Sequence, residues 1–194
     1  FESEFDLFLG TKREIAADVS DDASRIIDDV RRHGDDAIIA YADRFDDQKL
    51  TVGSLRVSDA EILSAAEKAS PSAKDALVVA ARRIEDFHLR QMPDDLQLEE
   101  SGGIALGYRW LPIASVGLYV PGGLAPYPST VLMTAVPARA AGVERIAMVT
   151  VTPGGDLHPM VAVAAQLSGV TEIYRIGGAQ AIAALALGTE HIPA

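Results

Sequence analysis

The chain has no cysteine among its 194 residues. This absence excludes a disulfide framework, a thiolate zinc site and a cysteine nucleophile within these residues. Basic side chains are also scarce, with 17 Lys and Arg against 28 Asp and Glu, which gives a formal charge of −11. Nucleic acids and anionic membranes bind clustered Lys and Arg, so we expect neither as a partner.

Long apolar runs are missing too. None reaches the roughly 18 to 20 uncharged residues that a membrane helix needs. The first ten residues, FESEFDLFLG, are acidic where a secretory signal is basic. With 48% hydrophobic residues, the chain can still bury a sizeable core. We therefore predict a folded, soluble, cytoplasmic protein.

The sequence lacks the common nucleotide and metal motifs. No G-x-G-x-x-G follows a strand and no G-x-x-x-x-G-K-[ST] occurs, so any nucleotide is bound by another arrangement. The histidines, at positions 33, 88, 158 and 191, show no H-x-x-x-H or comparable spacing. We predict no metal site formed wholly within this chain.

Charge is distributed unevenly along the chain. Residues 1–110 hold 14 of the 17 basic and 24 of the 28 acidic side chains, and the remainder of the chain is largely apolar. Elements so poor in charge must be covered by other protein on most sides. We predict an acidic, helix-rich region over residues 1–111 and an incomplete Rossmann-like unit over residues 112–194.

The first region reads as helices followed by a hairpin. Apolar spacing and capping residues predict the following elements: a helix capped by Ser20 or Asp21 and ending at His33-Gly34, a helix over Asp35–Phe45, a short strand at Leu55–Val57, a helix from the capping box Ser58-Asp59-Ala60-Glu61 to Lys68, a helix from Ser70-Pro71 to before Pro93, and a hairpin over 97–113. The helix after Pro71 is expected to bury Leu77, Val78, Ala81, Ile84 and Phe87.

The second region alternates short apolar strands with helices. Strands are predicted over 115–120, 145–151 and 172–176, and helices over about 129–141, 156–168 and 178–187. Gly142 and Gly169 take the positions where helices end. This βαβαβα order is typical of an α/β fold with a parallel sheet and right-handed crossovers.

Each predicted strand runs into a glycine pair: Gly122-Gly123, Gly154-Gly155 and Gly177-Gly178. Parallel strands end on one edge of the sheet, so the pairs should line one rim, where glycine lets a ligand approach closely. Free N–H groups of helix N-termini such as Ser129-Thr130 would favour an anionic cofactor there. Alternatively, the glycines serve only the strand-to-helix turns.

One long segment resembles a known family. Val116-Gly-Leu-Tyr-Val-Pro-Gly-Gly-Leu-Ala-Pro-Tyr-Pro-Ser-Thr-Val-Leu-Met133 is similar to the signature of the histidinol dehydrogenase family. Three further stretches agree in order and spacing: Pro137 to Val143, Leu167 to Leu185, and Gly188-Thr-Glu190. The acidic helices upstream also resemble that family's N-terminal region. The resemblance therefore covers nearly the whole chain.

The resemblance implies an NAD-dependent, zinc-containing homodimer with an aldehyde-dehydrogenase-like, three-layer α/β/α fold. It implies oxidation of L-histidinol through L-histidinal to L-histidine, the final steps of histidine biosynthesis. It also implies that Tyr119 and Gln180 contact NAD. From the residues alone, Tyr119 could be only a strand-end aromatic and Gln180 only a residue in the first turn of a helix. We expect their strands to bring both to one shared mouth.

The resemblance also implies which groups lie elsewhere. The zinc ligands, the Glu-His pair for acid–base catalysis, a third NAD contact and the histidinol-binding groups are expected beyond Ala194, so we assign no catalytic residue here. Three alternatives stay open. They are a related dehydrogenase of another small polar alcohol such as a sulfonated diol, an inert binding or assembly module using the acidic helices 20–91, and a cysteine-dependent aldehyde dehydrogenase.

Overall fold

The computed structural model describes residues 19–123 and 125–194. The fold contains two compact units: unit 1 joins the chain up to Leu55 with Ile176–Ala194, and unit 2 is Arg56–Arg175. The domain boundary predicted near residue 112 is based on the distribution of charge along the chain. The two units are defined by contacts instead, so they do not test that boundary, and it stays a prediction.

Unit 1 is helical in its described part. It contains a helix over residues 19–33, α2 (Asp35–Asp46), the short 3-10 helix η1 (Val52–Ser54) and α7 (Gly178–Leu187), and α2 packs against α7. The predicted stop at His33-Gly34 is confirmed, because Gly34 turns the chain with a φ of 54°. Ser20 and Asp21 lie inside the first helix, which already includes residue 19, so their predicted capping role is wrong.

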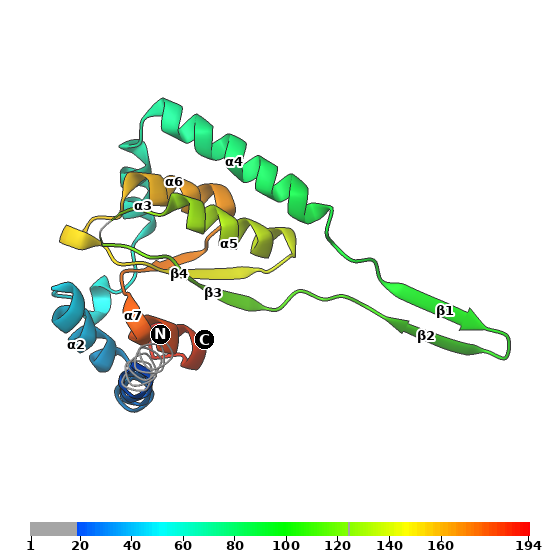
Figure 1. The fold of residues 1–194 in the computed structure, drawn as a ribbon, viewed down its shortest axis with the longest axis horizontal. Coiled ribbons are helices and arrows are strands. Elements are labelled where there is room, and N and C mark those ends of the chain that lie inside the picture. Colours follow the sequence, from blue (N-terminus) through cyan, green and yellow to red (C-terminus); the bar gives the residue numbers. More distant parts are fainter. Residues whose placement is uncertain (1–18, 124) are drawn as a thin grey trace, which may run out of the picture. The chain divides into compact units, whose positions relative to one another are not determined.

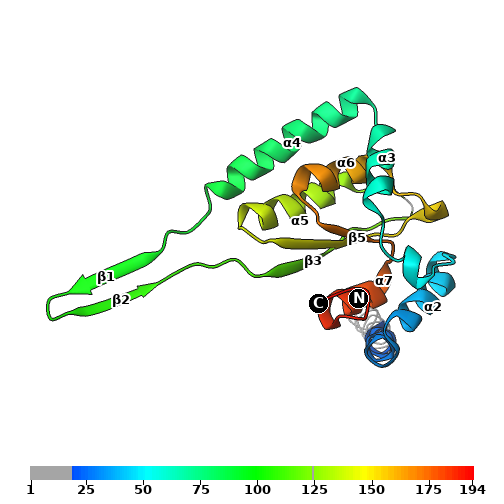
Figure 2. The same cartoon turned by 180° about the vertical axis from the view of Figure 1, so that it is seen from behind.

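Unit 2 contains a parallel three-stranded sheet. Strands β3 (Ser115–Tyr119), β4 (Arg145–Val149) and β5 (Glu172–Tyr174) pair in the order β3-β4-β5. Strand order equals chain order, so right-handed crossovers place both connecting helices on the same face. Figures 1 and 2 show α5 (Pro128–Ala140) and α6 (Pro159–Ser168) on that face. The predicted α/β class is confirmed.

A second helical layer covers α5 and α6. Helix α3 (Asp59–Glu67) packs on α6, and α4 (Pro71–Leu89) packs on both α5 and α6 (Figure 1). The capping box at Ser58 is confirmed, since its hydroxyl accepts from Glu61 N while Glu61 accepts from Ser58 N. The predicted strand at Leu55–Val57 shrinks to one bridge between Arg56 and Tyr174.

The core of unit 2 lies between the sheet and its helices. Alternate strand residues point to α5 and α6, as period two requires, and with Val120 just after β3 they join one cluster of buried side chains: Leu118, Ile146, Met148 and Ile173. Helix α4 buries Leu77 and Ala81, but Val78 and Phe87 are 48% and 60% exposed, so its apolar face is narrower than predicted.

No helix among the described residues is long and apolar enough to cross a membrane.

A β-hairpin links α4 to the sheet. Strands β1 (Leu96–Glu100) and β2 (Ile104–Tyr108) pair antiparallel, and Gly102 and Gly103 form the turn with positive φ. The hairpin predicted over 97–113 is therefore confirmed, but its strands span 96–108. All ten strand residues are exposed, and the hairpin extends away from the sheet of its unit (Figure 1).

Candidate functional site

A cleft of about 420 Å³ lies where β3 and β4 end. Three segments line it: the loop after β3 with Gly122 and Gly123, the chain after β4 from Thr150, and the N-terminus of α6 with His158 and Pro159. The glycines Gly154-Gly155 belong to the 3-10 turn η2 (Pro153–Gly155) between two lining residues, Pro153 and Asp156. The first two glycine pairs thus belong to loops around one cleft. The third pair belongs to unit 1, and its place at the same rim stays a prediction.

Gly122 is required by a close approach of two backbones. A Cβ added there would lie 2.5 Å from Val151 O and 3.0 Å from Val151 N. Gly123, Gly154 and Gly155 instead take positive φ, and a Cβ on any of them would meet nothing within 4 Å. The positive φ of Gly123, Gly154 and Gly155 fits the turn reading, and Gly122 is needed where two strand ends pack together; the close approach of a ligand stays a prediction.

The N-terminus of α6 forms the polar end of the cleft. His158 caps this helix, because its Nδ1 accepts a hydrogen bond from Met160 N at 3.2 Å. Pro159 follows at the first helical position, where the missing N–H costs nothing. Val161 N and Ala162 N both donate to His158 O, so this end of the cleft presents the side chains of His158 and Asp156, both exposed, as its polar groups.

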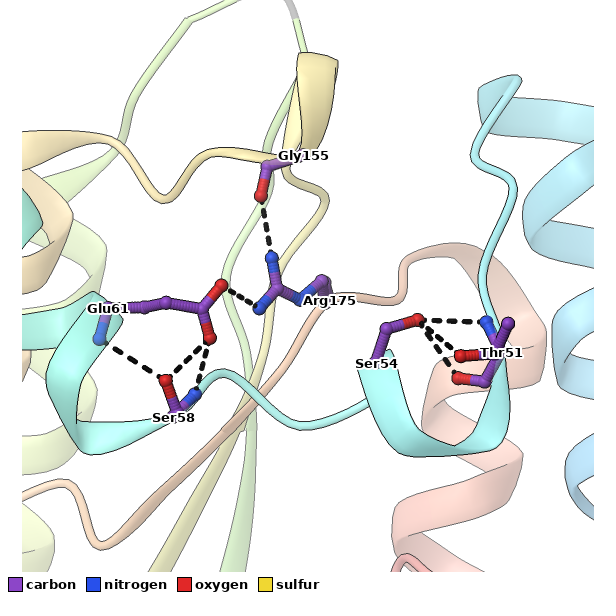
Figure 3. A network of polar contacts seen from close by, with 6 residues as sticks. All are labelled: Thr51, Ser54, Ser58, Glu61, Gly155 and Arg175. Atoms are coloured by element: carbon purple, nitrogen blue, oxygen red, sulfur yellow. Dashed lines mark hydrogen bonds and ion pairs between the residues drawn. The ribbon is translucent and has the colours of Figure 1, made fainter.

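An arginine holds the glycine turn beside this cleft. Arg175 follows β5 directly, and its guanidinium donates to Gly155 O and to Glu61 Oε1, both at 2.6 Å (Figure 3). The second carboxylate oxygen of Glu61 accepts from the N–H and hydroxyl of Ser58 at 2.9 and 2.7 Å. The hydrogen bond from Arg175, followed by those from Ser58, lowers the pKa of Glu61 from 4.5 to about 2.

Replacing Glu61 with Gln should remove a pH-dependent contribution to stability. A lowered folded pKa stabilises the fold above pH 4.5, and this contribution is lost as the pH falls towards 2. Because the Glu61 side chain is 50% exposed, solvent screening limits the contribution to about 1 kcal/mol. Urea unfolding should show a higher free energy of unfolding for wild type than for Glu61→Gln at pH 7, and this difference should largely disappear at pH 2.5.

The control is Glu67→Gln, at an exposed position near the end of the same helix. The difference in unfolding free energy between Glu67→Gln and wild type should change less between the two pH values than the difference for Glu61→Gln. An equal stability gap for Glu61→Gln at both pH values would contradict the assignment of the ionised carboxylate to Arg175.

Tyr119 lies at the end of β3 and is 38% exposed. It pairs in register with Val149 of β4 and sits on the sheet face opposite the α5 and α6 core. Two residues later the chain enters the cleft at Pro121. The phenol is therefore an accessible strand-end group beside the cleft loops.

Neighbouring polar residues fix the strands on the face that Tyr119 shares. Arg145 of β4 binds Glu172 of β5 through Nε–Oε1 at 3.0 Å, and the Tyr174 hydroxyl donates to Glu172 Oε2 at 2.6 Å. Burial, followed by the bond to Glu172, raises the pKa of Tyr174 to about 12. This network stabilises the pairing of β4 and β5.

Gln180 lies in the first turn of α7 and is only 1% exposed. Both side-chain amide atoms are buried, and neither has a hydrogen-bond partner among the described residues. The amide folds back on Gly178, whose φ is 66° and where an added Cβ would lie 2.5 Å from Gln180 Oε1. A buried amide without partners costs about 1–3 kcal/mol, so Gln180 does not stabilise the described fold through its polar atoms.

Tyr119 belongs to unit 2 and Gln180 to unit 1. Their predicted meeting at one mouth stays a prediction. The roles of Arg175 and Glu61 had no sequence signal, because the two residues are 114 positions apart. Glu61 was visible only as a member of a capping box.

One group in unit 1 offers ligand types that metals use. Possible ligand atoms of Asp35, Glu190 and His191 lie within 4.8 Å of one another. Asp35 is already engaged, since His191 Nδ1 lies 2.7 Å from its Oδ2 and the Thr189 hydroxyl donates to its Oδ1. These contacts tie the start of α2 to the segment after α7. These contacts do not test whether a metal binds, so the absence of a metal site within this chain stays a prediction.

Comparison with known proteins decides the family. A sequence model described as histidinol dehydrogenase matches residues 10–194. The chain belongs to the histidinol dehydrogenase family. The histidinol dehydrogenase of Rhodospirillum rubrum is 52% identical over 192 residues, which are 99% of this chain and 44% of that protein. That of Rhizobium meliloti is 55% identical, with the same coverage.

The fold agrees with a solved member of the family. The crystal structure of histidinol dehydrogenase from Elizabethkingia anophelis matches with a TM-score of 0.83 and 36% identity, over 90% of this chain and 40% of that one. The predicted family resemblance and α/β fold are thus confirmed. The chain spans less than half the length of the histidinol dehydrogenases that it matches.

Proposed function

We propose that this chain is part of an NAD-dependent histidinol dehydrogenase, which oxidises L-histidinol through L-histidinal to L-histidine in histidine biosynthesis. The chain contributes part of the NAD site. The observation that carries this role is the buried amide of Gln180, which has no hydrogen-bond partner among the described residues. Membership of the family, with curated relatives that are 52–55% identical and named histidinol dehydrogenase, supports the reaction.

The chemistry of two side chains and the glycines of the cleft support a dinucleotide as the ligand. The Gln180 amide offers two donors and an acceptor for ribose or phosphate oxygens, and the Tyr119 phenol offers an aromatic face and a hydroxyl. Gly122 permits two strand ends to approach at the base of the cleft, and open glycines around it leave room for a ligand. When bound, NAD accepts the hydride in this oxidation. Tyr119 and Gln180 bind and orient the cofactor.

The zinc ligands and the acid–base groups are not assigned to residues of this chain. Zinc-dependent oxidation requires a metal that holds the substrate and a paired base for the hydroxyl proton. The one candidate ligand group in the described residues has its Asp35 carboxylate bonded to Thr189 and His191. We therefore place the zinc ligands and the catalytic pair in the part of the family sequence that this chain does not cover.

The state of the protein in the cell is also part of the proposal. We propose a cytoplasmic homodimer that acts on L-histidinol and binds neither nucleic acid nor membrane. The acidic balance of the chain supports the last point. No observation favours a sulfonated diol over histidinol as the substrate, or an inert assembly module over an enzyme.

Titration of the full-length protein with NAD tests the site. Tyr119→Ala and Gln180→Ala should each weaken NAD binding about tenfold, the loss expected when one well-placed contact is removed from a bound ligand. Calorimetry gives the dissociation constant, and turnover with L-histidinol or with a sulfonated diol identifies the substrate. Both variants should keep the wild-type circular dichroism spectrum.

Tyr108→Ala and Gln166→Ala are the matched controls, since both residues are exposed and lie outside the cleft. They should bind NAD like the wild type. Unchanged affinity in Tyr119→Ala and Gln180→Ala would remove both residues from the site. A wild-type protein that binds no NAD would refute the cofactor assignment altogether.

A further inference from the structure

We infer that Arg175 is a positioning residue, which holds the Gly154-Gly155 turn so that one wall of the cleft is fixed for the cofactor. The inference rests on the proposed function, because it assigns the cleft to NAD. Arg175 is not one of the two proposed NAD contacts, since its side chain donates to Gly155 O and Glu61 Oε1.

The turn has few restraints of its own. Gly154 and Gly155 have φ values of 73° and 88°, and a Cβ at either would meet nothing within 4 Å. There is therefore open space on the Cβ side of both glycines. Within the turn, Gly155 N donates to Thr152 O at 2.9 Å, and from outside it Gly155 O accepts from Arg175 Nη1 at 2.6 Å. Arg175 supplies the anchor from the body of the unit.

The anchor itself rests on rigid elements. Arg175 continues β5, and its side chain is only 9% exposed. Its other terminal nitrogen binds Glu61, which the capping box fixes at the N-terminus of α3 (Figure 3). A strand, a helix and the glycine turn are thus joined through one guanidinium. The guanidinium reaches the two acceptors from two separate nitrogens in a fixed plane, whereas a lysine has a single nitrogen for both.

The bonding pattern favours a positioning role over a stabilising one. Arg175 Nε is buried without a hydrogen-bond partner among the described residues. Burying a charged group with a donor unsatisfied is unfavourable, and well-packed apolar residues at such positions are often as stable or more stable. Such an arrangement is expected where the position of the Gly155 carbonyl is important for function. Pro153 and Asp156, on either side of the held turn, both line the cleft.

The experiment uses the full-length protein with three variants. Arg175→Lys keeps the charge but loses the two-directional fork. Glu61→Gln keeps a capping-box residue for Ser58, yet presents no carboxylate to Arg175. Ser58→Ala is the matched control, since it weakens the same helix cap and leaves the Glu61–Arg175 pair in place. A general loss of stability would appear in all three variants.

Two readouts separate positioning from stability. Hydrogen exchange at the amides of Gly154, Gly155 and Asp156 should quicken in Arg175→Lys and Glu61→Gln, but not in Ser58→Ala. The KM for NAD should rise about tenfold in the first two variants, the effect of losing one charge-assisted hydrogen bond, while kcat stays within about twofold. Ser58→Ala should keep both kinetic constants.

Each contrary result is distinguishable. Faster exchange in Arg175→Lys with an unchanged KM for NAD would overturn the positioning role. Unchanged exchange would overturn the anchor itself. A wild-type protein that binds no NAD would refute the proposed function, and the inference about the cofactor wall would fall with it.

Discussion

Replacing Gly122 with Val is expected to lower the free energy of unfolding by about 3 kcal/mol, because it forces side-chain atoms into the backbone where two strands end. A Cβ at this position would lie 2.5 Å from Val151 O, 3.0 Å from Val151 N and 3.2 Å from Thr150 Oγ1. The first two contacts are backbone, so no rotamer change relieves them. The strand ends must separate, and the cleft between their loops must change shape.

Urea denaturation of the full-length protein measures this loss. Gly53→Ala is the control, because Gly53 has no positive φ and a Cβ there would meet nothing within 4 Å. Its stability should stay within about 0.5 kcal/mol of wild type, as at most surface positions. A Gly122→Val protein as stable as Gly53→Ala would show that the β3 and β4 ends can move apart freely.

Gln180→Met is expected to stabilise the protein without cofactor and to weaken NAD binding. Gln180 is 1% exposed, and its amide oxygen and nitrogen lack hydrogen-bond partners among the described residues. An apolar side chain of similar size removes the cost of that unpaired amide, and we expect a gain of about 1 kcal/mol. The same change removes the groups proposed to bind ribose or phosphate, so NAD affinity should fall about tenfold.

Thermal unfolding without NAD and calorimetric titration with NAD measure the two effects. Gln166→Met on α6 is the control, because Gln166 is exposed and has water to satisfy its amide. It should change neither quantity. A loss of stability in Gln180→Met would show that the amide has partners within the intact fold, and the argument from an unsatisfied group would fail.

Much of the fold follows from short-range signals. The capping box at Ser58 and Glu61, the Ser70-Pro71 start of α4 and the helix-ending Gly169 all act within a few residues, so the sequence predicts them directly. The alternation of apolar strands and helices after residue 115 predicts the parallel sheet for the same reason.

Errors occur where distant residues decide the outcome. The predicted strand at Leu55–Val57 forms only a bridge to Tyr174, because strand length depends on the partner. The predicted burial of Val78 and Phe87 fails, since α4 contacts α5 and α6 over a narrow stripe. Periodicity gives an amphipathic helix, but the width of its buried face depends on its neighbours.

The candidate site divides in the same way. The sequence by itself determined the glycine loops and the family, because these depend on residue types at short spacing, while the choice of Tyr119 and Gln180 came only from the family resemblance and stays a proposal. Only the tertiary structure decided that Gly122 faces a neighbouring backbone, that the Gln180 amide is buried unpaired and that Arg175 joins Glu61 to Gly155. Such contacts join residues far apart in the chain, and folding alone brings them within bonding distance.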